Sequence, residues 1–223
     1  MSRRIIRSRL ADNIYLVRFK TQYELAATFL RVQEYYESGR FSGRVFTLEE
    51  YMDWYASRFG AFTYYEDWSG FNVPSTSFKP FYEGKFDPLL EKEKRLLRLF
   101  RHERAPYYVI GVAGTGSRRD VVHELAHALF FTDATYRQAV RTAMRKYDTS
   151  AMEDALARMG YARRVLQDEV HAYLVAPTGA IGRSSPAFAP LRKRLRALFT
   201  RHSRGLSLPA ISRARSRALP PGS

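Results

Sequence analysis

The chain has 223 residues, no cysteine and a formal net charge of +15. Its length fits one domain, and a composition of 45% hydrophobic and 14% aromatic residues can build a core, which excludes a wholly disordered chain. The absence of cysteine excludes a disulfide-rich secreted module and any thiolate chemistry. No apolar run approaches about 18 residues, so the sequence predicts no membrane span.

The positive charge gathers at the two ends of the chain. Residues 1–9 contain four arginines and residues 183–223 contain ten basic residues, with no acid in either segment. Residues 10–182 contain the remaining 23 basic residues and all 22 acids, so the net charge of the middle of the chain is close to zero. We expect one domain over 1–182, with an α/β part at 10–105 and the chemical site within 106–176. Residues 183–223 are expected to form a basic linker, a short helix and a disordered tail.

Hydrophobic spacing predicts the elements of the first half of the chain. Residues 13–19 are rich in β-branched and aromatic side chains, which is typical of a strand. Thr47-Leu-Glu-Glu50 is a capping box, so a helix should begin there. The aromatic segment 67–86 has no period, and is either the wall of a substrate cleft or an ordered connector. In chain order the predicted elements are a strand at 13–19, helices at 22–36 and 47–58, a strand at 62–65, the loop at 67–86 and a helix at 88–104.

The second half begins with the clearest strand pattern, YYVIGV at 107–112, whose apolar run predicts a buried strand. A second capping box, Ser117-Arg-Arg-Asp120, predicts the start of a helix that continues to residue 131. Further helices are predicted at 134–147, 150–159, 161–176 and 188–200. The expected fold class is α+β, with a small sheet and helices in the first half and a helical second half.

His123-Glu124-Leu125-Ala126-His127 is an HExxH motif. Residues four apart share one face of a helix, so both imidazoles can bind one metal ion. Zinc lowers the pKa of a bound water to about 7, and Glu124 can act as general base on that water. A shuffled chain of this composition contains the motif about 0.006 times. The sequence therefore predicts a Zn²⁺ site, and the alternative is a surface helix that carries these residues by chance.

A catalytic zinc site needs a third protein ligand beside the two histidines. We prefer Glu169, which follows His127 by 42 residues and lies on the predicted helix at 161–176. Asp168 and His171 are rivals in the same turn, and Glu169 could instead pair with an arginine on its own helix.

Asp133 is a further candidate ligand, only six residues after the motif. It ranks lower because a ligand there requires glycine at the position of Phe130 to turn the chain sharply, and phenylalanine continues the helix. The remaining histidines, His102 and His202, lie among arginines and are expected on solvated surfaces.

From 107 to 176 the chain resembles the zincin metallopeptidases, in which a strand precedes the HExxH helix. A distant glutamate as third ligand is similar to the gluzincin subtype. The resemblance implies zinc ligands His123, His127 and Glu169, with Glu124 as base. Gluzincins often carry an aspartate four residues after the third ligand, where this chain has Tyr173. The metzincin pattern is not met, because its glycine and third histidine are absent.

Zincins stabilise the oxyanion with a tyrosine or histidine outside the metal shell. The candidates here are His171, Tyr173 and Tyr161. We prefer His171 because an imidazole can donate a hydrogen bond to an oxyanion. However, His171 follows Glu169 by two residues, so the two side chains point about 200° apart around the helix. Arg118 and Arg119 could bind a substrate carboxylate or simply face solvent.

We therefore predict a zinc-dependent metallopeptidase that hydrolyses peptide bonds of a peptide or protein substrate. A cytoplasmic location is expected, since no apolar segment of a signal peptide follows the first arginines. One alternative is a nucleic-acid-associated protein that binds phosphates through the basic residues 183–223. The other is a non-catalytic zincin-like binding protein.

Overall fold

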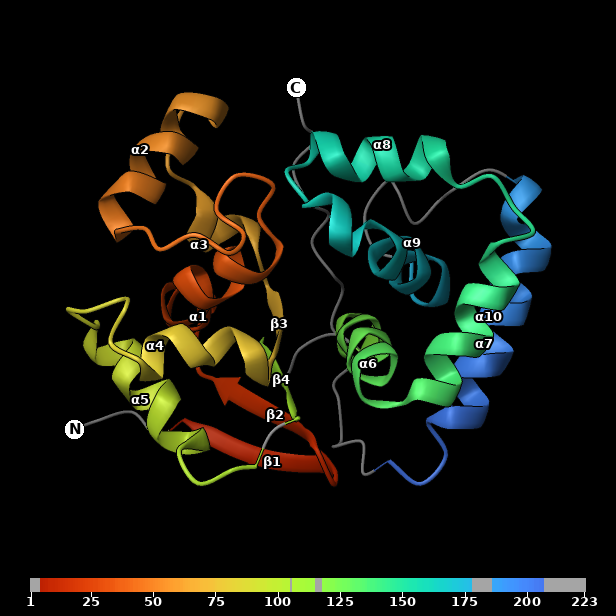
Figure 1. Cartoon of the computed structure of the whole chain (residues 1–223), viewed down its shortest axis with the longest axis horizontal. Coiled ribbons are helices and arrows are strands. Elements are labelled where there is room, and N and C mark those ends of the chain that lie inside the picture. The colour runs from red at the N-terminus through yellow and green to blue at the C-terminus, as the bar shows by residue number, and fades with distance from the viewer. Residues whose placement is uncertain (1–4, 105, 115–117, 178–185, 207–223) are drawn as a thin grey trace.

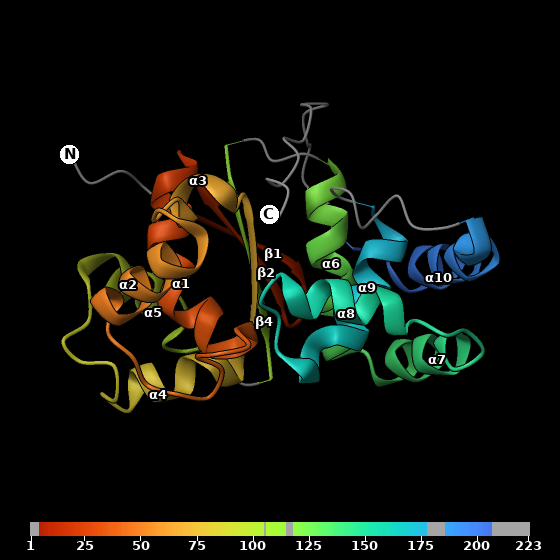
Figure 2. The ribbon, with the colours of Figure 1, turned by 90° about the horizontal axis from the view of Figure 1, so that it is seen from above.

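The computed structural model describes residues 5–104, 106–114, 118–177 and 186–206. The fold is α+β: a mixed four-stranded sheet stands between two groups of helices (Figure 1). Seen from above, α1–α5 cover one face of the sheet and α6–α10 lie on the other (Figure 2). No helix in the described ranges is long and apolar enough to cross a membrane.

The sheet has the strand order β1-β2-β4-β3. The central strands β2 and β4 are parallel, and each pairs with an antiparallel edge strand. The strands are β1 (Ile6–Ala11), β2 (Ile14–Phe19), β3 (Gly70–Pro74) and β4 (Tyr108–Ala113).

Alternation along the central strands divides the core in two. Tyr15 and Val17 of β2 pack with the aromatic-rich helices of the first half, whereas Leu16 packs with the helices of the second half. Because successive strand residues point to opposite faces, one buried strand serves both cores. This explains why β2 and β4 are apolar nearly throughout.

In the first half, the structure confirms the predicted strand at 13–19 and the predicted helices at 22–36 and 47–58. At the start of α2, Thr47 Oγ1 accepts from Glu50 N at 3.1 Å and the Glu50 carboxylate accepts from Thr47 N at 2.7 Å, which confirms the capping box. The helical elements are α1 (Gln22–Glu37), α2 (Leu48–Phe59), α3 (Tyr64–Asp67), the 3₁₀ turn η1 (Ser75–Phe78), α4 (Lys79–Tyr82) and α5 (Glu91–Phe100).

Three expectations for the first half are wrong, and one predicted helix is shorter than expected. Strand β1 lies in the basic N-terminal segment, where none was predicted. The strand predicted at 62–65 is replaced by helix α3, whose Tyr64 is buried and donates to Glu34 at 2.8 Å. The unpatterned segment 67–86 contains β3. The helix predicted at 88–104 begins only at Glu91, because the Glu93 carboxylate accepts from Leu90 N and sets the first turn there.

The second half has the predicted strand and helices, with ends shifted by a few residues. The capping box at Ser117 and the linker at 178–185 lie outside the described residues, as does the tail after 206. The helical elements are α6 (Arg118–Thr132), α7 (Ala134–Met144), α8 (Ser150–Arg158), η2 (Arg163–Val165), α9 (Leu166–Val175), η4 (Pro186–Phe188) and α10 (Ala189–His202).

Helix α10 packs on α7 and α9 although it lies in the basic segment. Leu191 and Leu195 are fully buried in the core of the second half, while Lys193 and Arg194 are exposed. Its apolar residues therefore recur at helical spacing and its charge faces solvent. The packed part of the chain extends past residue 182, where we placed the end of the domain.

Candidate metal centre

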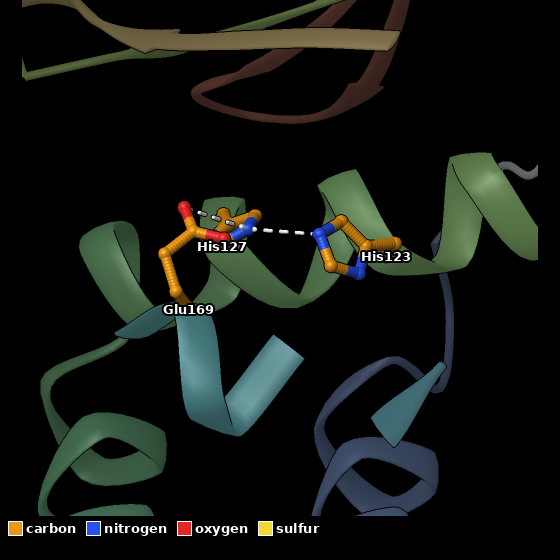
Figure 3. Close-up of side chains that lie close together, drawn as sticks. All are labelled: His123, His127 and Glu169. Carbon is orange, nitrogen blue, oxygen red and sulfur yellow. Dashed lines mark hydrogen bonds and ion pairs between the residues drawn. The ribbon is translucent and has the colours of Figure 1, made fainter. Parts of the chain in front are cut away.

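Helices α6 and α9 bring together three side chains that could hold a metal ion (Figure 3). His123 and His127 lie one turn apart on α6, and their Nε2 atoms are 3.3 Å apart. From α9, Glu169 Oε1 lies 3.6 Å from His127 Nε2. One ligand atom from each of the three residues lies within 4.8 Å of the others, and all three side chains are buried.

This set of side chains fits a zinc ion. Two imidazole nitrogens and one carboxylate oxygen are common ligand atoms of zinc in proteins. The second oxygen of Glu169 is buried and has no hydrogen-bond partner among the described residues. An unsatisfied buried carboxylate oxygen is unfavourable, and a bound cation would remove the cost.

The protonation of the cluster is set by burial and mutual charge. Burial raises the pKa of Glu169 to about 8. It lowers the pKa of His123 to about 3, which keeps that imidazole neutral. Burial alone would also lower the pKa of His127, but the Asp168 and Glu169 carboxylates outweigh it and raise the pKa to about 10. Near neutral pH the charges of the cluster thus lie mainly on His127 and Asp168.

Asp168 supports His127 from the side away from Glu169. Its Oδ2 lies 3.0 Å from His127 Nδ1, so it accepts the proton on that nitrogen and leaves Nε2 for a metal. We considered Asp168 only as a rival ligand, and missed this role. The gluzincin position for an orienting aspartate is four residues after the third ligand, whereas here the carboxylate comes from the residue before it.

His171 does not lie in the pocket. It is fully buried in the core, its Nε2 is 2.7 Å from the Tyr136 hydroxyl, and its ring stacks on Phe130. Its Nδ1 lies 3.4 Å from Asp168 Oδ1, and the other oxygen of the same carboxylate contacts His127. This place argues against the catalytic role predicted for His171 and makes it a partner of Asp168.

Asp133 is also outside the site. It caps the start of α7, accepting from Tyr136 N at 2.9 Å, and its other oxygen lies 2.7 Å from His202 Nδ1. His202 therefore has an acidic partner, which corrects the expectation of a merely solvated histidine.

The general-base candidate Glu124 is held by strand β3. Asn72 Nδ2 donates to Glu124 Oε2 at 2.6 Å, and the Tyr108 hydroxyl donates to the amide oxygen of Asn72. A Cβ at Gly70 would lie 2.6 Å from Glu124 Oε1, so only glycine leaves room for this carboxylate. Burial raises the pKa of Glu124 to about 7. Sequence reasoning missed Asn72 and Gly70, because their segment has no periodic pattern.

The pocket over the three ligands has walls from both halves of the chain. Trp68, Ser69 and residues of β3 form one wall of this pocket. Other aromatic residues of segment 67–86, such as Phe78 and Phe81, pack in the core of the first half, so the segment is also an ordered connector. Tyr161 and Tyr173 also line the pocket, and the Tyr173 ring centroid is 4.8 Å from that of His123. Four carboxylates and no lysine or arginine are among the described lining residues.

The predicted arginines do not contribute to this lining. Arg119 is exposed outside the pocket, and the Arg118 side chain lies outside the described residues. The predicted residues that line the pocket are His123, Glu124, His127, Tyr161, Glu169 and Tyr173. In comparisons with known proteins, no family model, no curated protein and no solved structure matches the chain.

Proposed function

We propose that this protein is a zinc-dependent peptidase of zincin type, with His123, His127 and Glu169 as metal ligands. The observation that carries the proposal is the convergence of these three donors in a pocket beside a fourth, separately held carboxylate, Glu124. Structural zinc sites are closed by four protein ligands, whereas catalytic sites use three and keep one position for water or substrate. The three-ligand group in the described residues matches the catalytic pattern.

Glu124 has the position and the pKa expected of a general base. A zinc ion in the site would supply a Lewis acid and lower the pKa of a bound water to about 7. Asn72 holds Oε2 of Glu124 and leaves Oε1 to accept a proton from the attacking water and pass it to the leaving nitrogen. Burial raises the pKa of this carboxyl, which favours a group that can both accept a proton and return it.

Tyr161 and Tyr173 are the candidates for oxyanion stabilisation. Burial raises the pKa of both phenols, so each keeps its proton at neutral pH and can donate a hydrogen bond. Both line the pocket, unlike His171, which was the first choice from sequence.

The test of this function is Glu124→Gln, assayed on an unstructured protein substrate together with zinc content per chain. The variant should keep one zinc per chain and lose at least about 100-fold in hydrolysis, because the amide cannot accept the proton. Glu49→Gln, at an exposed position on α2, is the matched control. Purified protein without zinc, or a Glu124→Gln variant as active as the wild type, would overturn the proposal.

A further inference from the structure

Helices α7 and α10 form a basic surface that the proposed chemistry does not use. They pack side by side at the end of the molecule farthest from α1–α5 (Figure 1 and Figure 2). Segment 134–147, which contains α7, has four basic residues, and segment 186–206, which contains α10, has six, with no acid in either. No residue of these two segments lines the pocket over the candidate metal ligands. The surface is therefore a separate feature of the molecule.

The cations of α10 face solvent and have no acidic partner in the described ranges. Lys193, Arg194 and Arg201 are exposed, while Leu191 and Leu195 on the other side of the helix are fully buried. None of the three cations forms an ion pair with a described residue. The rest of the sequence, outside the described ranges, contains no aspartate or glutamate. The positive charge of this helix is thus available to a partner.

Helix α7 adds further exposed cations. Arg141 and Arg145 are exposed, and Arg145 donates to a threonine hydroxyl of its own helix, which leaves its charge in place. Of the two acids that flank segment 134–147, Asp133 already caps the helix and contacts His202, and Asp148 is exposed. Asp148 offsets only part of the charge of the four basic residues, so the surface stays positive.

The kind of basic residue favours a partner that carries phosphate. Eight of the ten basic residues in the two segments are arginine. A guanidinium group is planar, weakly hydrated and able to donate two parallel hydrogen bonds to one phosphate, which an ammonium group cannot do. A cluster of exposed arginines on one face of a protein is typical of a surface that binds nucleic acid.

The spacing of the cations fits a duplex. Arg194 and Arg201 are seven residues apart, so they share one face of α10 and lie about 10 Å apart along its axis. Packed helices have axes about 8–10 Å apart, which gives the scale of the separation between the cations of α10 and those of α7. The grooves of B-form DNA are about 6 and 12 Å wide. Cations on the two helices can therefore contact phosphates of both strands.

A membrane surface fits these helices less well. A basic amphipathic helix binds a bilayer by burying its apolar face among the lipids. The apolar face of α10 is already used, because Leu191, Leu195 and Phe199 are buried in the core of the second half. None of the exposed large hydrophobic side chains in the described ranges lies on α7 or α10. The two helices thus offer charge to a partner but no apolar surface.

A single strand also fits less well than a duplex. Proteins that bind single strands stack the bases on exposed aromatic side chains. The aromatic residues of α7 and α10 are Tyr136 and Phe199, and both are buried. In a duplex the bases are already stacked on one another and the phosphates lie outside, so charge alone is sufficient for binding.

We infer that the surface of α7 and α10 binds the phosphate backbone of a double-stranded nucleic acid without reading its sequence. The inference is independent of the proposed peptidase, since the surface shares no residue with the pocket. Binding should therefore need neither zinc nor Glu124. DNA and RNA duplexes offer the same phosphate chemistry, so both serve as probes.

The experiment measures binding of the full-length protein by fluorescence anisotropy at several salt concentrations between about 50 and 200 mM. The probes are a labelled DNA duplex, an RNA duplex and a DNA single strand of equal length. Lys193→Gln, Arg194→Gln and Arg201→Gln are combined in one variant. It should bind both duplexes at least about 10-fold more weakly at about 100 mM salt. The slope of log affinity against log salt should fall by about 2 to 3, because each lost phosphate contact removes about 0.9.

A variant with the same change in charge elsewhere serves as the matched control. Arg44→Gln, Arg98→Gln and Arg101→Gln remove three exposed cations of the first half. This control should keep the duplex affinity within a few-fold of the wild type and keep its salt slope. A second test variant, Arg141→Gln with Arg145→Gln, examines α7 alone and should lower the slope by about 1 to 2.

Several results would overturn the inference. Equal loss of affinity in the α10 variant and the matched control would show that charge anywhere on the molecule is sufficient. An unchanged salt slope in the α10 variant would place the binding on other basic segments. Tighter binding to the single strand than to either duplex, or binding to vesicles that contain phosphatidylserine but to neither duplex, would identify a different partner. Similar affinity for DNA and RNA duplexes would support recognition of the backbone, and a preference for one would assign the source of the phosphates.

Discussion

The Asp168 carboxylate lies 3.0 Å from Nδ1 of His127, and the next residue, Glu169, lies 3.6 Å from Nε2 of the same ring. Two consecutive residues of α9 therefore hold both nitrogens of one imidazole. A carboxylate on Nδ1 fixes the tautomer that presents Nε2 to a metal and makes that nitrogen a better donor. The packing of α9 on α6 thus both supplies one candidate metal ligand, Glu169, and orients another, His127.

Asp168→Asn should weaken zinc binding by about 10- to 100-fold, the usual cost of losing such an orienting carboxylate. The amide can still contact His127 but brings no negative charge. Competition with a chromophoric chelator at pH 7 measures the dissociation constant. Asp53→Asn, exposed on α2, is the matched control. An unchanged dissociation constant in Asp168→Asn would show that the contact does not support the metal.

His171→Phe tests whether this histidine acts in chemistry or only in the core. It leaves the Tyr136 hydroxyl and one oxygen of Asp168 without their buried partner, so the free energy of unfolding should fall by about 1–3 kcal/mol. Once saturated with zinc, the variant should keep kcat within a few-fold of the wild type, since His171 does not line the pocket. A kcat loss of about 100-fold, as expected for an oxyanion donor, would restore the catalytic role.

Gly70→Ala tests the placement of Glu124. The added Cβ would lie 2.6 Å from Oε1, so the carboxylate must move away from its bond with Asn72. A misplacement of about 1 Å can cost up to about 100-fold in rate, so kcat should fall while one zinc per chain is retained. Ser69→Ala, the neighbouring residue of the same wall, should have a much smaller effect. Full activity of Gly70→Ala would mean that Glu124 does not act from this position.

Glu34 should make the protein less stable as the pH rises. Burial raises its pKa to about 7, although the Tyr64 hydroxyl donates to it at 2.8 Å. The unfolded chain releases this proton near pH 4.5 and the folded chain near pH 7. The stabilisation from the neutral carboxyl is therefore complete below pH 4.5 and lost as the pH rises to 7, a change of about 3 kcal/mol.

Urea unfolding at pH 4.5 and pH 8 checks this sign. Glu34→Gln should reduce the loss of unfolding free energy between the two pH values by about 3 kcal/mol, because the amide does not ionise. Tyr64→Phe removes a donor that favours the ionised form, and should make the loss larger than in the wild type. The same pH dependence in wild type and Glu34→Gln would contradict the prediction.

Local patterns predicted the elements whose residues repeat at a fixed spacing. The apolar period of α1, the capping box at Thr47 and the buried strand at 107–112 are properties of neighbouring residues, and the structure confirms all three. The predictions were wrong for the segments without a repeating pattern. Strand β3 was missed because its partner strand β4 lies far along the chain: the paired residues are separated by 34 (Pro74 and Tyr108) to 42 (Gly70 and Val112) positions.

The sequence by itself determined that His123 and His127 share one face of a helix, because a four-residue spacing fixes their geometry locally. Only the tertiary structure decided what surrounds them: Asp168 behind His127, Asn72 and Gly70 around Glu124, and Glu37 across the pocket. These contacts join elements that are far apart in the chain, such as the 52 residues between Asn72 and Glu124. The order of strands and the packing of α9 on α6 bring them together, and no local spacing encodes that order.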